Sequence, residues 1–534
     1  MNQLVNRTWY EYYPPEMKKG ISYPEVPLYQ LLEHTAARYG SRAAIIYEET
    51  IITYEELKRK VDQLAGAWDH LGLLKGERIG LMVSNHPDYM IAYYAAQRLG
   101  LIVVQINPRY TARELLQIID DADMNFLVVD KEQLSTVDQV KDMCELRQIF
   151  VANDGERETR SITHLIHQAS PLEREIPISV KEDVAVIQYT GGTTGKMKGA
   201  MLTHFNLVAN VVQSHAMYGE KMEKGKEVIL TATPLYHVYA MTSAMNLGIY
   251  IGATILLIRK FKVEDVLDRV KRFRPTFFPG VPGMYNAFVN HPDVESYNLD
   301  CLKFCSSGSA PLPVEIIKQF EAMTGAVIGE GFGLTEASPS THRNPTFGVR
   351  KVGSIGIPLP GTDSKIVNEE NQELPENSVG ELIIKGPQVM KGYWKKDEET
   401  RHALRNGWLY TGDLAMTDED GYFYIVGRKK EMIINGGFNI YPQEIESVLY
   451  EHPDVKESAV VGIPNHEKGE IVKAYIVAKD GHTIDVEELK GHCYRNLTRY
   501  KVPKQFEITK DLPRNTVGKL LKRKLIETEK QKGG

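Results

Sequence analysis

The feature that most constrains the fold is a loop rich in glycine and threonine, YTGGTTGKMKG, over residues 189–199. It follows the continuous apolar run Val184–Ile187, which predicts a strand buried on both faces. Beyond the loop, Thr203 is placed to cap a helix. A strand, a glycine-rich loop and a helix in this order let backbone N–H groups converge on phosphate, and Lys196 and Lys198 add positive charge. The stretch therefore predicts an α/β protein with a phosphate-binding loop.

The loop is not a Walker A motif. From Gly191 the spacing to Gly195-Lys196 is one residue short, and Met197 stands where that motif has Ser or Thr for magnesium. Taken alone, the loop fits a flexible turn as well as a phosphate site, so its interpretation depends on the rest of the chain.

Length and composition exclude several classes of protein. A chain of 534 residues is too long for one compact core, so we expect at least two domains. A net charge of −6 argues against a dedicated nucleic-acid-binding protein, whose binding face would be basic. The four cysteines have neither zinc-site spacing nor the density of a disulfide framework, which indicates free thiols in a reducing cytosol.

The distribution of apolar residues along the sequence indicates neither a signal peptide nor a membrane span. The first ten residues lack an apolar signal core, so the sequence predicts a cytoplasmic protein. The segment Val228–Ile258 has no charged residue apart from His237, but Pro234, Gly248 and Gly252 interrupt it. It therefore predicts a buried strand–loop–helix–strand unit. A peripheral membrane contact and a homodimer stay open.

Short apolar runs alternate with helical stretches in the first part of the chain. The runs 78–83, 101–104 and 126–129 are typical of buried strands, and residues 88–98 have helical spacing. This alternation predicts parallel sheets covered by helices. Towards the C-terminus we expect strands at 458–462, 472–478 and 505–509 and a helix over 486–500. These elements predict a small α+β domain.

Three later apolar runs each end in small residues: Phe277–Gly283, Phe304–Ala310 and Val327–Gly331. Neighbouring strands that end in this way can form a floor for a flat ligand. The other interpretation is ordinary turn chemistry of an α/β protein.

The loop resembles the phosphate loop of the adenylate-forming superfamily, which comprises acyl-CoA synthetases, luciferases and peptide-synthetase adenylation domains. Six further stretches match motifs of this superfamily in its order, over roughly residues 30–525. They are Pro234–His237, Gly329–Glu336, Tyr410–Asp413, Gly427–Lys430, Gly436–Asn439 and Pro513–Lys519. Six matches in order exclude chance.

The resemblance implies a two-domain architecture. It consists of a large N-terminal domain of layered αβ sheets (residues 1–427), a hinge at 428–430 with Lys430 as its pivot, and a small mobile α+β lid domain (431–534). The implied reaction is ATP- and Mg²⁺-dependent activation of a carboxylic acid to an acyl-adenylate. Transfer to CoA then gives acyl-CoA, AMP and pyrophosphate.

The resemblance also implies a role for individual residues. Lys519 contacts the substrate carboxylate and the α-phosphate, Glu336 and Thr190 hold Mg²⁺, and Asp413 accepts from the ribose hydroxyls. CoA is expected to bind beside Gly436, Gly437 and Phe438. The residues implied to bind ATP or AMP are Thr190, Gly191, Gly192, Thr193, Thr194, Gly195, Lys196, Lys198, Gly308, Ser309, Ala310, Gly331, Phe332, Gly333, Leu334, Thr335, Asp413, Ile425, Arg428 and Lys519. The family usually has Tyr at position 332, and Phe332 keeps its stacking face.

The predicted acyl pocket is apolar, with no charged side chain to select a polar substrate. Its residues are His237, Val238, Tyr239, Met241, Thr242, Phe278, Gly280, Val281, Pro282, Tyr285, Leu334 and Ser338. Such a lining suits a medium- to long-chain fatty acid, bound mainly through burial of CH₂ groups at about 0.8 kcal/mol each. His237 is either a packed core histidine or a gate near the acyl carbon and the thiol.

The stretches 188–195, 385–390 and 437–442 are most similar to bacterial long-chain fatty-acid–CoA ligases. An aryl-acid CoA ligase, of the 4-coumarate or benzoate kind, is the alternative. A non-catalytic nucleotide-binding relative is a third, but such a protein is expected to lose Lys519, Glu336 or Asp413, and all three are present.

Overall fold

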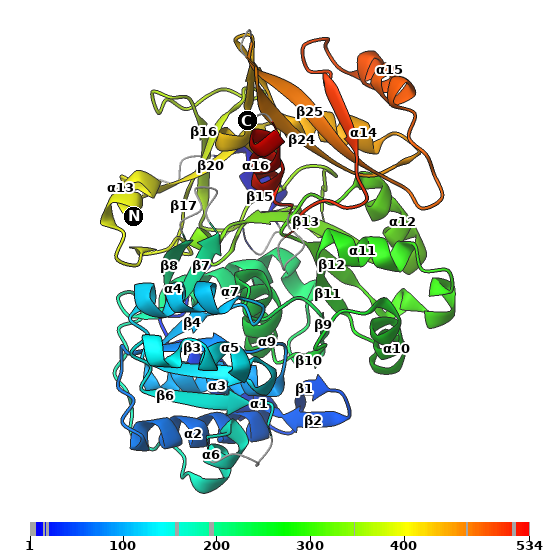
Figure 1. The fold of residues 1–534 in the computed structure, drawn as a ribbon. Coiled ribbons are helices and arrows are strands. Elements are labelled where there is room, and N and C mark those ends of the chain that lie inside the picture. Colours follow the sequence, from blue (N-terminus) through cyan, green and yellow to red (C-terminus); the bar gives the residue numbers. More distant parts are fainter. Residues whose placement is uncertain are drawn as a thin grey trace. The chain divides into compact units, whose positions relative to one another are not determined.

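The computed structural model describes residues 7–13, 17, 21–154, 160–191, 197–346, 348–465, 468–514 and 520–532. The chain divides into two compact units (Figure 1). The first comprises Met1–Asp363 and Ile384–Leu409, and the second comprises Ser364–Ile383 and Tyr410–Gly534. The predicted domain boundary at residue 427 and the hinge at 428–430 stay predictions.

The first unit contains a nine-stranded sheet in the part of the chain that is described. In order across the sheet, its strands are β15 (Ile357–Pro358), β14 (Ser340–Arg343), β13 (Val327–Gly333), β12 (Phe304–Ser307), β11 (Phe277–Gly280), β9 (Val228–Thr231), β10 (Thr254–Leu257), β1 (Ala43–Tyr47) and β2 (Thr50–Thr53). The strands from β13 to β1 run parallel, as the alternating pattern predicts.

A second sheet of this unit, with seven strands among the described residues, carries the glycine-rich loop. In order, its strands are β18 (Gly392–Tyr393), β8 (Met197–Thr203), β7 (Val184–Gly191), β4 (Ile102–Gln105), β3 (Arg78–Met82), β5 (Phe126–Asp130) and β6 (Gln148–Ala152).

The α-helices of the first unit fall between and outside these sheets. They are α1 (Tyr29–Tyr39), α2 (Tyr54–His70), α3 (Pro87–Leu99), α4 (Ala112–Ala122), α5 (Leu134–Asp138), α6 (Ile162–Gln168), α7 (His204–Tyr218), α8 (Val238–Ala240), α9 (Leu247–Ile251), α10 (Val263–Phe273), α11 (Pro282–Val289), α12 (Val314–Thr324) and α13 (Asp397–Ala403).

Helix α3 shows why the sheets form layers. Every residue of α3 is buried, because the sequence between Tyr89 and Ala96 is apolar all round the helix. Side chains of both sheets pack in one core with α3, whereas alternate residues of the same strands face other helices. Val186 of β7 points into this core, and its neighbour Ile187 packs with α4. Strands that bury both faces appear in the sequence as continuous apolar runs.

The strand that follows the glycine-rich loop was not predicted. The loop joins β7 to β8, which are antiparallel, and α7 begins after β8, at His204. Thr203 does cap α7, in a capping box with Asn206, as predicted. The run MKGAMLT has no clear strand period, so its pairing with β7 and β18 comes from tertiary context.

Within the described residues, the second unit contains most strands of two further sheets. One comprises β16 (Asp363–Val367), β17 (Gly380–Lys385), β20 (Trp408–Thr417) and β19 (Leu404–Arg405), with β21 (Phe423–Arg428) paired to β20. In this sheet, β19 and the first two residues of β20 fall in the residue range of the first unit. The other contains β23 (Phe438–Ile440), β22 (Ile433–Asn435), β25 (Gly469–Ala478) and β24 (Val455–Asn465), with β26 (Gln505–Ile508) paired to β25. Its helices are α14 (Pro442–Tyr450), α15 (Val486–Asn496) and α16 (Lys522–Lys532).

The predicted helix over 486–500 is too long. Helix α15 ends at Asn496, and Leu497 is extended, with φ −128° and ψ 149°. Leaving the helix there buries Leu497 and Val502 in the core of the second unit. The other expected elements of this region, and the layered α/β plan of the larger unit, are confirmed.

Two expectations about the class of protein can be compared with the structure. Within the described residues, no helix is both long and apolar enough to cross a membrane, and Val228–Ile258 forms strand, helices and strand as predicted. All four cysteines are free thiols, and Cys305 and Cys493 are buried.

Candidate functional site

The hairpin of β7 and β8 brings two predicted phosphate-site residues together. Its register places Thr190 opposite Lys198 at the base of the loop. Both side chains are half-buried. The predicted residues Gly192, Thr193, Thr194, Gly195 and Lys196 lie outside the described part of the chain, as does the predicted catalytic Lys519.

Glu336 lies beside this hairpin. It belongs to a short 3₁₀ helix, η9 (Thr335–Ala337), which packs next to both β7 and β8. Its carbonyl accepts from Met390 N (2.8 Å), and its Oε1 accepts from the Tyr393 hydroxyl (2.7 Å). The Lys198 ammonium lies 5.1 Å from the centroid of the Tyr393 ring. One phenol thus contacts a carboxylate at its edge and an ammonium on its face.

The donor set suits Mg²⁺ bound to a nucleotide. Magnesium takes oxygen ligands, and in nucleotide sites it combines one or two carboxylates with phosphate oxygens. Glu336 supplies a carboxylate, and Thr190 on the neighbouring strand supplies a hydroxyl. Among the described residues no group of three or more His, Cys, Asp or Glu side chains forms a metal cage of its own. Glu336 and Thr190 therefore fit a metal held jointly with phosphate.

Asp121, near the end of α4, supports the hairpin from the other side. Its carboxylate accepts from the Tyr189 hydroxyl (2.7 Å) and from Lys396 Nζ (2.8 Å), and its carbonyl accepts from Trp394 Nε1 (3.1 Å). Burial, together with this carboxylate, raises the pKa of Tyr189 well above its usual range, so the phenol stays a neutral donor. The residue before Thr190 is thereby fixed.

The three strands that end in small residues lie side by side. The registers of β11, β12 and β13 align Gly280 with Ser307 and Ser307 with Glu330. Ser309, which follows β12, has a positive φ of 72°. A Cβ at Gly333 would lie 2.4 Å from the Pro339 carbonyl oxygen, so the close approach of the two backbones requires glycine there. Residues 308–310 follow β12 and residues 331–333 end β13, so the predicted adenine residues lie on neighbouring strands, and their role stays a prediction.

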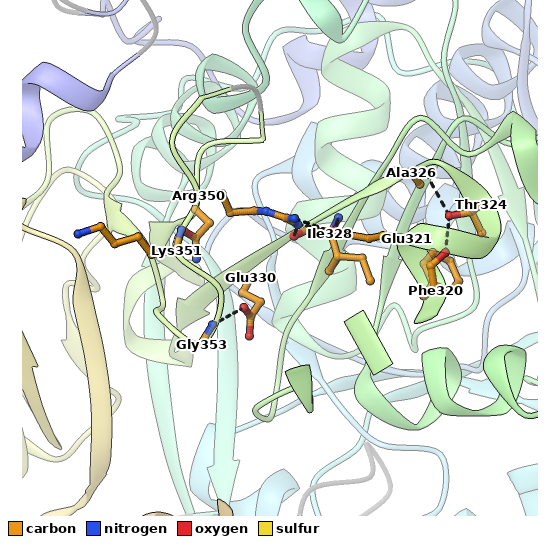
Figure 2. Close-up of polar contacts among 10 residues, drawn as sticks. Phe320, Glu321, Thr324, Ala326, Ile328, Glu330, Arg350, Lys351 and Gly353 are labelled. Carbon is orange, nitrogen blue, oxygen red and sulfur yellow. Dashed lines mark hydrogen bonds and ion pairs between the residues drawn. The ribbon is translucent and has the colours of Figure 1, made fainter. Parts of the chain in front are cut away.

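Glu330 lies within the motif Gly329–Glu336, but no role for it was predicted from the sequence. Its Oε2 accepts from Gly353 N (3.0 Å), as Figure 2 shows. Burial raises the pKa of Glu330 to about 7, with the Gly353 N–H and Arg350 opposing the effect. A carboxyl with this pKa is partly protonated at neutral pH.

An ion pair next to Glu330 fastens the loop that follows β14. Arg350 contacts Glu321 of α12 through both guanidinium nitrogens, with 2.8 Å between Nη2 and Oε2 (Figure 2). Arg350 Nη1 also donates to the Ile328 carbonyl (2.8 Å), and Ile328 N donates to Glu321 Oε1 (2.8 Å). A bidentate pair of this kind fixes both partners. Hydrogen bonds of Arg350 and Glu321 therefore join α12, β13 and the segment around Arg350.

The second unit brings two predicted ribose-site residues together. The register of β20 and β21 places Asp413 opposite Arg428, and Asp413 Oδ1 lies 3.0 Å from Arg428 Nε. The Asp413 side chain is 5% exposed and that of Arg428 37%. Ile425 lies on the same strand as Arg428, and Lys430 is exposed in the 3₁₀ helix η10 (Lys429–Glu431).

The predicted CoA residues form the tip of a short hairpin. Asn435 pairs with Phe438, leaving a two-residue turn at Gly436 (φ 58°) and Gly437 (φ 84°). Positive φ at both positions is the geometry of a type I′ turn. Phe438 is 56% exposed, and its ring stacks on Tyr500 with centroids 4.6 Å apart.

The predicted acyl-pocket residues divide between two cores of the first unit. Val238 and Met241 pack in the core that contains α3, whereas Phe278 and Tyr285 pack with α11 and α12. Tyr239 connects the two regions, because its hydroxyl and that of Tyr285 both donate to the Ser306 carbonyl. Thr242 and Ser338 are buried and joined by a hydrogen bond from Thr242 Oγ1 to Ser338 O (2.7 Å).

His237 begins α8. Its Nδ1 accepts from Tyr239 N (3.3 Å), and the residue is half-buried. After α8 the chain forms a π-helical stretch, η6 (Met241–Asn246), which the sequence analysis missed. Stretches of π-helix occur often at functional sites. Tyr393 and Asp121 were also missed, because no local pattern marks a residue that acts on a distant segment.

Comparisons with known proteins agree with this arrangement. The family model of the AMP-binding enzymes matches residues 32–394, and that of their C-terminal domain matches residues 444–519. The long-chain-fatty-acid–CoA ligase of Bacillus subtilis (strain 168) is 41% identical over 98% of both chains. The feruloyl-CoA synthase of an Amycolatopsis species is 35% identical over 91% of this chain and 94% of that protein.

Among solved structures, ATP-bound MatB from Rhodopseudomonas palustris has a TM-score of 0.88 at 32% identity, over 95% of this chain and 100% of that chain. These matches span nearly the whole chain and confirm the family resemblance that the motifs indicated. The chain belongs to the family of AMP-binding enzymes and is an adenylate-forming CoA ligase.

Proposed function

We propose that this enzyme activates medium- to long-chain fatty acids in a reaction that requires ATP and Mg²⁺, and then transfers the acyl group to CoA. The observation that carries the proposal is the apolar lining of the predicted acyl pocket. None of its members is a formally charged Asp, Glu, Lys or Arg, and Val238 and Met241 are fully buried among other apolar side chains. The 41% identity with a long-chain ligase over the whole chain supports the same substrate.

In the first step an oxygen of the fatty-acid carboxylate attacks the α-phosphorus of ATP. The bond from that phosphorus to the oxygen bridging to the β-phosphate breaks, and pyrophosphate leaves with the electron pair. Lys198 and Lys519 offset the negative charge of the phosphates. Glu336 and Thr190 would hold Mg²⁺, which supplies further charge compensation when bound.

In the second step the CoA thiolate attacks the acyl carbon, the bond to the adenylate oxygen breaks, and AMP leaves. Asp413, held by Arg428 at 3.0 Å, accepts from the ribose hydroxyls. The turn at Gly436 and Gly437 lies beside the pantetheine arm of CoA, and His237 acts as a gate near the acyl carbon. Lys519 acts in the first step and the Gly436–Gly437 hairpin in the second. The small domain turns about Lys430 between the two steps.

An aryl acid is the second candidate substrate. The similarity to a feruloyl-CoA synthase favours it, and an apolar pocket with Tyr239 and Phe278 can also contact a ring. The pocket residues lie in two cores, so a flat ring and a long chain would use different parts of them.

The test is release of AMP that depends on both ATP and CoA, measured with acetate, octanoate, palmitate, benzoate and 4-coumarate. We expect a maximum at octanoate or palmitate, and loss of that activity in Lys519→Ala. A maximum at benzoate or 4-coumarate would transfer the assignment to the aryl-acid ligases. If no acid gives AMP while ATP still binds, the enzyme reaction itself is wrong.

A further inference from the structure

Tyr393 lies at the meeting point of two segments that contribute to the proposed ATP site. It belongs to β18, which pairs with β8 so that Tyr393 faces Ala200. Backbone hydrogen bonds from Lys391 N to Met201 O (2.9 Å) and from Trp394 N to Gly199 O (2.8 Å) fix the strand on both sides of it. Tyr393 as a whole is 8% exposed. The position of its hydroxyl is therefore set by the sheet.

That hydroxyl reaches Glu336 on η9, 57 residues away in sequence. It donates to Oε1 at 2.7 Å. Within the described residues no group donates to the second carboxylate oxygen, Oε2.

The face of the same ring holds a cation. Lys198 Nζ lies 5.1 Å from the ring centroid, a distance at which an ammonium is attracted by the aromatic quadrupole. Lys198 and Glu336 carry opposite charges, and the Tyr393 side chain contacts both. The phenol keeps the carboxylate at its edge and the ammonium on its face.

We propose that Tyr393 is a positioning residue for the metal–triphosphate end of ATP. Its hydroxyl fixes the rotamer of Glu336 so that one carboxylate oxygen is occupied and the other is presented to the cation. The inference rests on the proposed function, because it assumes that Glu336 binds the metal. It predicts that loss of the hydroxyl weakens binding of the magnesium complex of ATP more than binding of ATP alone.

The variant Tyr393→Phe removes the hydroxyl and keeps the ring, its packing and the contact with Lys198. Isothermal titration calorimetry would measure the dissociation constant of ATP with excess Mg²⁺ and, separately, with EDTA. We expect the first constant to rise about tenfold, as for loss of one hydrogen bond to a charged group. The constant measured in EDTA is expected to change by less than about twofold.

Tyr475→Phe is the matched control. The Tyr475 hydroxyl donates to Glu529 Oε1 at 2.8 Å, a phenol–carboxylate bond of the same kind within the second unit. This variant should leave both constants unchanged. Thermal unfolding of both variants tests whether the fold is kept.

Two results would overturn the proposal: unchanged binding of the magnesium complex in Tyr393→Phe, or an equal loss with and without the metal. The second would mean that the hydroxyl only supports the fold. If the wild type binds ATP with Mg²⁺ but forms no acyl-CoA from any fatty acid, the proposed substrate fails and the role of Tyr393 stands. If the wild type shows no metal-dependent binding, both fail.

Discussion

Two glycine-containing hairpins of this enzyme are built in opposite ways. The hairpin of β7 and β8 lies inside a seven-stranded sheet, between β4 and β18, and side chains from distant segments contact its base. The hairpin of β22 and β23 has strands of three residues and lies at the edge of its sheet. Ile434 and Phe438 on it are about half exposed, and Tyr500 is the aromatic support of Phe438.

The difference corresponds to what each hairpin must present. The first hairpin must hold charged groups at fixed positions, but a glycine-rich loop and a lysine side chain are both flexible. Contacts from Asp121 to Tyr189 and from Tyr393 to Lys198 therefore restrict their positions. The second presents mainly backbone and one ring. Two glycines with positive φ allow the shape of its turn, and one backbone hydrogen bond, from Gly436 N to Lys468 O (2.8 Å), ties it to a distant segment.

The largest expected effect is at the first hairpin. In Glu336→Gln the metal loses a charged ligand, and we expect pyrophosphate exchange to fall about 100-fold or more, as when a preorganised electrostatic group is lost. The measurement is exchange of labelled pyrophosphate into ATP. Thioester formation from a synthetic acyl-adenylate is the control and should change by less than about threefold. An equal fall in both reactions would contradict the assignment of Glu336 to the first step.

Asp121→Asn tests the support on the other side of this hairpin. Lys396 would lose its ionic partner (2.8 Å) and the buried Tyr189 phenol a charged acceptor (2.7 Å), so we expect the first unit to lose about 1–3 kcal/mol of unfolding free energy. Denaturant unfolding followed by tryptophan fluorescence measures this loss. Asp69→Asn, which removes an exposed ion pair with Arg174, should cost less than about 1 kcal/mol. Equal losses would show that Asp121 is an ordinary surface carboxylate.

Gly437→Ala tests the second hairpin. A Cβ at Gly437 meets nothing within 4 Å, so the effect is the cost of φ 84° for an alanine, about 1–2 kcal/mol. We expect thioester formation to slow several-fold while pyrophosphate exchange is unchanged. Gly481→Ala has the same open surroundings and φ 78°, and it should cost the second unit similar stability without slowing either reaction. A slowing in both variants would refute a specific role of the turn.

The smallest effect is expected at Glu330 of β13, whose carboxyl group accepts from Gly353 N (3.0 Å) outside both hairpins. Its pKa is about 7 in the folded protein, against an ordinary value of 4.5. A raised carboxyl pKa stabilises the fold below pH 4.5, and this contribution is lost as the pH rises through 7. Glu330→Gln should therefore match the wild type near pH 4.5 and exceed its stability by about 1 kcal/mol at pH 8, since the group is partly solvated. Thermal unfolding at both pH values measures this, and a difference that does not vary with pH would contradict it.

Much of the fold was predictable because it depends on local chemistry. Val184–Ile187 is apolar at every position, so its burial on both faces followed from the sequence. The cap at Thr203 needs only a hydroxyl oxygen three residues before the backbone N–H that donates to it, and the turn at Gly436 and Gly437 needs only residues that tolerate positive φ. The motif order, in turn, predicted the family and the residues at which ATP, CoA and a carboxylic acid are expected to bind.

What the sequence alone determined about this protein is thus its layered α/β plan, its family and the loops that carry its motifs. Only the tertiary structure decided that β8 intervenes between the glycine-rich loop and α7, and that Asp121 and Tyr393 support the loop. Tyr189 and Asp121 are 68 residues apart, and Glu336 and Tyr393 are 57 apart. Such pairs meet because of sheet order and register, which depend on packing across the whole unit rather than on any local pattern.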